Sequence, residues 1–191
     1  MKLCCIAMMG GVMALALPAV AAAQGFDTRD AASIQAVENL EAYAVYKMGQ
    51  YDLARERWEA LAAKGNTTAM INLSNMHAQG QGVPRDPAAA RNWTRKAAEL
   101  GDARAQLELG LAYERGDGVE RNLDEAALWL GRAAEKGNAE AQFSLGVLLA
   151  TGQGKGPEAA TPEQRRQARS WLSKAAESGH EEAAAMLSVL K

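Results

Sequence analysis

Apolar residues recur along this chain at the spacing of amphipathic helices. In four places an alanine is followed four residues later by a leucine, a distance that puts both side chains on one helix face. These pairs are Ala69 and Leu73, Ala105 and Leu109, Ala141 and Leu145, and Ala183 and Leu187. The pattern predicts one helix at each of the four places.

A second block alternates with these helices. The segment 93–101, which begins with Trp93, returns at 129–137 and at 171–179, with spacings of 36 and 42 residues, and a more distant copy lies at 58–65. A period of this length is the signature of a repeat architecture. Each unit is therefore a pair of helices, and we predict an all-α chain that forms an α-α superhelix, or solenoid.

Local signals mark where these helices begin and end. Asp86, Asn122 and Thr161 stand at predicted N-caps of the second helices, and glycines close those helices at 65, 101, 137 and 179. An alanine three residues before each closing glycine leaves room for a neighbouring backbone. We expect Asn66, Asp102 or Asn138 to start the helix that follows.

The segment 105–119, with Ala126, Trp129 and 133–137 after it, resembles a Sel1-like repeat, a relative of the tetratricopeptide repeat. The resemblance divides residues 66–191 into units at 66–101, 102–137 and 138–179 and a half-unit at 180–191. Residues 24–65 resemble a degenerate tetratricopeptide-like pair. The third unit departs from the pattern by six extra residues around 156–161, and the chain lacks the paired cysteines of the disulfide-stapled branch of the family.

The N-terminus has the pattern of a secretory signal. Lys2 precedes a non-polar run at 3–17, Pro18 breaks the run, and small residues end it at 21–23. We expect residues 1–23 to be a signal peptide cleaved near Ala23 and Gln24, which leaves no cysteine in the mature chain. The alternative is an uncleaved anchor, because the segment 3–23 is long enough to cross a bilayer.

Charge and residue inventory narrow the possible functions. With 21 basic and 23 acidic residues the net charge is −2, so the chain lacks the basic excess that nucleic-acid binding requires. Only His77 and His180 are histidines, and no metal-binding or cofactor motif occurs. Ser188 and Lys191 form a Ser-x-x-Lys match without its companion motifs.

The resemblance implies a non-enzymatic protein that binds another protein, acting as an adaptor in a bacterial periplasm or outside the cell. A cell-wall-acting or β-lactam-hydrolysing enzyme is the alternative, and a structural spacer is a third possibility.

A second, mostly apolar stripe on the first helices is the predicted partner site. It would form the floor of a concave groove with a charged rim. The candidates are Ile71, Asn75, Arg104, Leu107, Leu111, Arg115, Glu140, Phe143 and Val147. Alternatively, adjacent first helices, or a long helix at about 29–47, cover this stripe. The six-residue insertion is either a contact loop or neutral drift.

Overall fold

A computed structural model describes residues 27–189, and within that range every regular element is a helix. The chain divides into two compact units, one ending at Ile34 and one beginning at Gln35, and the described part of the first is only the start of α1. The predicted signal peptide lies outside the described residues. The elements are α1 (Asp27–Lys47), α2 (Tyr51–Ala63), α3 (Thr67–Gln79), α4 (Pro87–Glu99), α5 (Ala103–Arg115), α6 (Leu123–Glu135), α7 (Ala139–Ala150), the 3₁₀ turn η1 (Pro157–Ala159), α8 (Pro162–Glu177) and α9 (Glu181–Val189).

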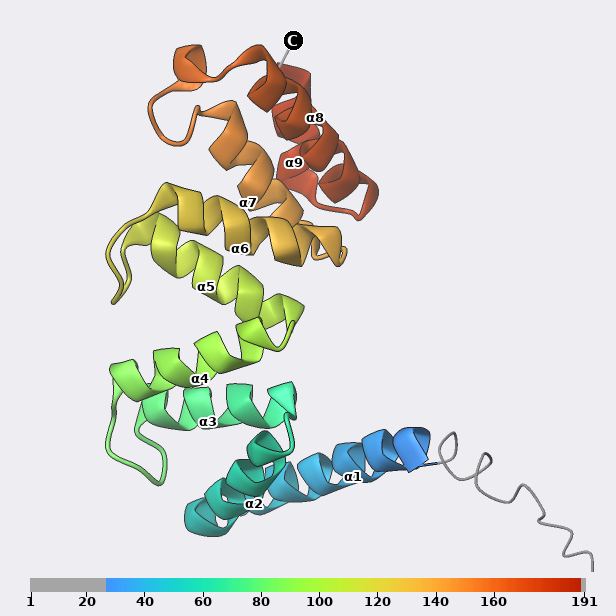
Figure 1. Cartoon of the computed structure of the whole chain (residues 1–191), viewed down its shortest axis with the longest axis vertical. Helices are drawn as coiled ribbons and strands as arrows, with labels where there is room; N and C mark the ends of the chain where they lie inside the picture. Colours follow the sequence, from blue (N-terminus) through green and yellow to red (C-terminus); the bar gives the residue numbers. More distant parts are fainter. Residues whose placement is uncertain (1–26, 190–191) are drawn as a thin grey trace, which may run out of the picture. The chain divides into compact units, whose positions relative to one another are not determined.

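From α3 onward the helices form antiparallel pairs that follow the chain order. α3 packs on α4, α5 on α6 and α7 on α8, and each second helix also contacts the first helix of the next unit (Figure 1). The prediction of an all-α repeat of helix pairs is confirmed.

The predicted caps are present at the helix starts. The side chains of Asn66, Asp102 and Asn138 each accept a hydrogen bond from a backbone amide three residues later. Thr161 forms a capping box with Gln164, in which each side chain bonds the other residue's backbone amide. These bonds satisfy donors that have no partner inside the helix, so the helices begin where the sequence predicts.

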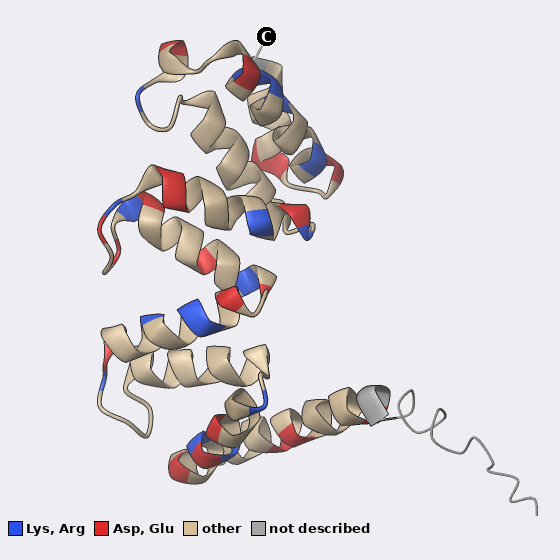
Figure 2. Ribbon diagram, viewed as in Figure 1, with Lys and Arg blue, Asp and Glu red and all other residues tan. Residues whose placement is uncertain are grey.

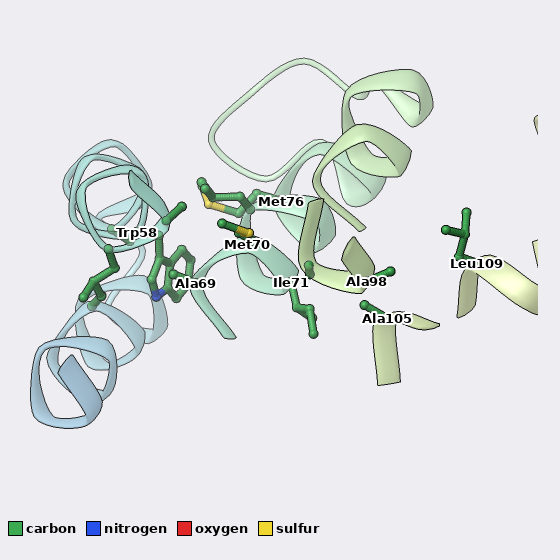
Figure 3. Packing of buried hydrophobic residues seen from close by; sticks show 14 of the residues in the cluster. Trp58, Ala69, Met70, Ile71, Met76, Ala98, Ala105 and Leu109 are labelled. Carbon is green, nitrogen blue, oxygen red and sulfur yellow. The ribbon is translucent and has the colours of Figure 1, made fainter. Parts of the chain in front are cut away.

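Small residues bring the helices close together. Ala98 of α4 lies next to Ala105 of α5 in the core (Figure 3), and both are fully buried. Within the second and third pairs the contact leaves no room for a side chain, because a Cβ on Gly110 would lie 2.8 Å from Leu130 Cγ and one on Gly146 would lie 2.7 Å from Leu172 Cγ. A glycine at these two positions therefore sets the spacing between the paired helices.

The four tryptophans are buried to different depths. Trp58 and Trp129 are buried, but Trp93 and Trp171 are only half-buried. In three of the four, the cationic side chain of the residue three positions later lies over the ring. The pairs are Lys96 over Trp93 at 4.3 Å from the ring centroid, Arg132 over Trp129 at 4.4 Å and Lys174 over Trp171 at 4.1 Å.

The six-residue insertion packs against the turn that follows α7. Its Ala160 is 2 % exposed, and the Ala160 carbonyl accepts a hydrogen bond from Arg165 at 2.9 Å. A Cβ on Gly152 would lie 2.8 Å from the backbone at Ala159 and Ala160. The insertion therefore closes over the turn that follows α7.

Candidate functional site

The structure places the nine predicted partner-site residues at different depths. Ile71 is buried in the core; Leu107, Leu111, Phe143 and Val147 are half-buried. The polar members are exposed: Asn75, Arg104, Arg115 and Glu140.

Part of the apolar stripe contributes to packing between units. Leu107 and Leu111 pack against the cluster that contains Leu130 and Leu145, and Phe143 packs against the cluster around Leu172. What remains accessible is one side of each half-buried side chain, with charged residues beside it. Partner binding on this surface stays a prediction.

Glu140 and Phe143 contact His180, the residue that follows the closing glycine of the third unit. The imidazole of His180 stacks on Phe143 with ring centroids 4.2 Å apart, and His180 Nε2 lies 3.2 Å from a Glu140 carboxylate oxygen. His180 Nδ1 lies 3.2 Å from Glu182. His180 thus connects the start of α9 with α7 through these contacts. Its position after Gly179, where earlier units carry Asn or Asp, is the signal that could have found it.

A groove lies at the junction of the first and second repeats. It encloses about 450 Å³ between α4 and the elements of the next repeat, and we call it the junction groove. Its floor is formed by small or aliphatic side chains, and its walls carry charge. The residues that define it here are Ala90, Arg91 and Thr94 from α4 and Leu109, Ala112 and Gly118 from the following repeat. Sequence reasoning missed the groove.

Some of the charged side chains at the junction groove have a hydrogen-bond partner, and others have none among the described residues. Arg85 Nε donates to the Ala78 carbonyl at 3.1 Å, and the Glu108 carboxylate accepts from Arg104 at 3.3 Å. Asp117, also at the groove, is exposed. The guanidinium of Arg91 makes no hydrogen bond or ion pair with any residue in the described part of the chain.

Asp86, the N-cap of α4, belongs to the same electrostatic environment. The hydrogen bond from the Ala89 amide is the largest effect and lowers the pKa of the Asp86 carboxyl. Desolvation opposes it, and the Ala88 amide and the nearby His77 and Arg91 lower the pKa further. The carboxylate is therefore already engaged with the helix start. Elsewhere, basic and acidic residues are mixed along the described helices (Figure 2).

The serine of the Ser-x-x-Lys match forms a hydrogen bond within its own helix. The Ser188 hydroxyl donates to the Ala185 carbonyl of its own helix at 2.6 Å, and Lys191 lies outside the described residues. Over residues 27–189 no cluster of His, Cys, Asp or Glu has the makeup of a metal site. In the same range no helix combines the length and apolarity needed to span a membrane.

Comparison with known proteins identifies the repeat. A family model described as the Sel1 repeat matches residues 67–102, 103–138 and 139–180. No curated protein matches.

Two solved structures resemble the chain. One is a Sel1 repeat protein from Oxalobacter formigenes, with 34 % identity and a TM-score of 0.67 over 73 % of this chain and 39 % of that one. The other is a protective antigen with an SLR fold from uropathogenic Escherichia coli, with 35 % identity and a TM-score of 0.63 over 73 % of this chain and 29 % of that one. The chain thus spans less than two-fifths of either protein.

Proposed function

Because the chain belongs to the Sel1 repeat family, we propose that it is a non-enzymatic adaptor that binds a segment of another protein in the bacterial cell envelope. Sel1 repeat proteins generally mediate protein–protein interaction. The envelope location is supported by the signal-like pattern of residues 1–23.

The observation that carries the proposal is the surface of the first helices. Leu107, Leu111 and Val147 are half-buried, so each retains an accessible apolar side, and exposed charges such as Arg104 and Arg115 flank them. An apolar centre with a polar rim is the usual composition of a protein interface. A partner segment laid across successive first helices would complete the burial of these side chains.

Site-specific crosslinking in cells tests this proposal. A photoreactive phenylalanine derivative is placed at Asn75 or Arg115, which are exposed on first helices, and at Ser170, which is exposed on the second helix α8, as the matched control. We expect a discrete crosslinked product from the two first-helix positions and none from the control. Equal products from all three positions, or none from any, contradict the proposed surface.

The envelope location is tested separately by cell fractionation. When the full sequence is expressed, we expect the protein in the periplasmic or secreted fraction, and in the cytoplasm once the run at 3–17 is interrupted by charged residues. A chain that stays in the cytoplasm without such a change contradicts the location but leaves the binding surface untouched.

A further inference from the structure

Comparing the two repeat junctions within the chain shows that the junction groove results from specific substitutions. At three positions the second junction has a leucine. At the equivalent positions, one unit earlier, the first junction has a smaller or a polar residue. The pairs are Pro87 and Leu123, Thr94 and Leu130, and Ala112 and Leu148. Leu130 and Leu148 are at most 3 % exposed, so at the second junction these side chains belong to the core. At the first junction the corresponding volume is open.

A fourth substitution places a charge in the groove. Arg91 stands where the next unit has Ala127. Its side chain crosses from α4 to the loop after α5, where a Cβ on Gly118 would lie 2.3 Å from the Arg91 Cζ atom. Gly118 has a φ of +68°, so glycine both permits this loop conformation and leaves room for the guanidinium.

The chemistry of the groove favours a carboxylate as its ligand. Arg91 offers guanidinium donors that no described residue accepts, and a planar carboxylate can accept two of them at once. Two acidic side chains line the groove: Glu108 already pairs with Arg104, and Asp117 is exposed. Ala90, Leu109 and Ala112 add an apolar floor suited to an adjacent aliphatic side chain.

We propose that the junction groove binds a carboxylate of the partner protein, with Arg91 as the group that contacts it and the floor at Ala112 receiving a neighbouring apolar side chain. This inference rests on the proposed adaptor function and assigns a partner chemistry to one position along the array. The carboxylate is that of an Asp or Glu side chain or of a chain terminus, and the test below separates these sources.

Nuclear magnetic resonance titration with short peptides tests the proposal directly. The probes are acetyl-Ala-Leu-Glu-Ala-amide, its Gln analogue as an amide, and the Gln analogue with a free C-terminal carboxylate. We expect the Glu peptide or the free-acid peptide to shift the Arg91 side-chain Nε–H and Gly118 amide signals saturably, and the uncharged Gln amide to bind roughly tenfold more weakly or not at all. Equal shifts with all three peptides, or no saturable shift with any of them, overturn the proposal.

Two variants and a control distinguish binding from mere space filling by Arg91. Arg91→Ala places the next unit's residue at this position and should weaken the carboxylate peptide roughly tenfold, whereas Arg169→Ala, at the equivalent exposed position of the third repeat, should leave binding unchanged. Ala112→Leu places the next unit's leucine in the groove and should abolish binding while the melting temperature is kept or raised. Undiminished binding by Arg91→Ala or by a folded Ala112→Leu protein overturns the proposal.

The outcome is separable from that of the adaptor proposal. If the peptides fail to bind while the first-helix positions still crosslink to a partner in cells, the carboxylate site is wrong and the adaptor function stands. If neither experiment gives a specific signal, both are wrong.

Discussion

At the scale of single residues, two buried glutamines connect successive repeats. Gln106 Nε2 donates to the Ala98 carbonyl at 3.0 Å, and Gln142 Nε2 donates to the Ala134 carbonyl at 3.1 Å. Both side chains are about 95 % buried, and the Oε1 atom of each has no hydrogen-bond partner among the described residues. Each bond ties a first helix to the last turn of the preceding second helix.

This geometry predicts different effects on the free energy of unfolding for two substitutions of similar size. Gln142→Met introduces the residue type that the first repeat has at Met70, and it removes both the bond and the unsatisfied oxygen, so we expect the free energy of unfolding to change by less than about 1 kcal/mol. Gln142→Glu buries a carboxylate against a carbonyl and should cost more than about 2 kcal/mol at neutral pH. Urea unfolding measures both, and equal costs would contradict the assignment.

From the lowered pKa of the Asp86 carboxyl we predict a specific dependence of stability on pH. Its folded pKa is lowered chiefly by the Ala89 and Ala88 amides, so its contribution to stability is present above the unfolded pKa and is lost as pH falls through the folded pKa. Asp86→Asn keeps the capping oxygen but not the charge. We expect the wild type to have the higher urea midpoint at pH 7 and the difference to vanish in strong acid. A difference that is the same at both pH values would show that the charge is irrelevant.

At the scale of the helix pair, the first repeat uses a different contact from the other two. Where Gly110 meets Leu130, the first repeat has Ser74 and Thr94, whose hydroxyl oxygens lie 2.9 Å apart, and Ser74 also donates to the Ala90 carbonyl. A polar, hydrogen-bonded pair has thus replaced a glycine and a leucine at the closest point of two helices.

The two residues of this pair should be energetically coupled. Ser74→Gly leaves the Thr94 hydroxyl without its partner, and Thr94→Leu brings a leucine against the Ser74 Cβ, which the 2.8 Å separation at Gly110 shows to be too close. The double variant recreates the glycine–leucine contact. A double-mutant cycle from urea unfolding should give a favourable coupling of about 1 kcal/mol or more. Additive single effects would rule out a direct exchange of the two contacts.

How much of the fold and of the candidate site the sequence predicts depends on how far apart the interacting residues lie along the chain. Caps and closing glycines act within three or four residues, so Asn66 and Thr161 could be identified from the sequence directly. The contact of His180 with Glu140 joins residues 40 positions apart. The burial of Ile71 also depends on the tertiary packing, because one amphipathic pattern fits both an exposed and a covered stripe. The junction groove results from missing volume, which appears only when equivalent positions of two repeats are compared.

At the scale of the whole molecule, the buried hydrophobic residues of the described part of the chain form three clusters that broadly follow the order of the helix pairs. The first includes Trp58 and Leu73, the second Leu130 and Leu145, and the third Leu172 and Ala183. When each repeat contacts only its neighbours, stability is approximately a sum over repeats and their interfaces. A local change should therefore have a local effect.

Leu172→Ala tests this modularity. The side chain is fully buried and packs at Gly146, so its truncation should cost about 2–5 kcal/mol. Hydrogen exchange should accelerate in α7, α8 and α9 while the amides of α3 keep their protection. Leu128→Ala, at a side chain that is 47 % exposed, is the control and should change little. Uniform acceleration along the chain would instead indicate one cooperative unit.

The distribution of tryptophan has an optical consequence. Each helix pair from α1–α2 to α7–α8 contains one indole, at Trp58, Trp93, Trp129 and Trp171, and the chain contains no others. Replacing three of them with phenylalanine would leave a fluorophore that reports on a single repeat. The depth of burial differs among them, from 1 % exposed at Trp58 to half-buried at Trp93, so their emission maxima should differ as well. The repeat thus supplies intrinsic probes with which melting can be followed one pair at a time, without any external label.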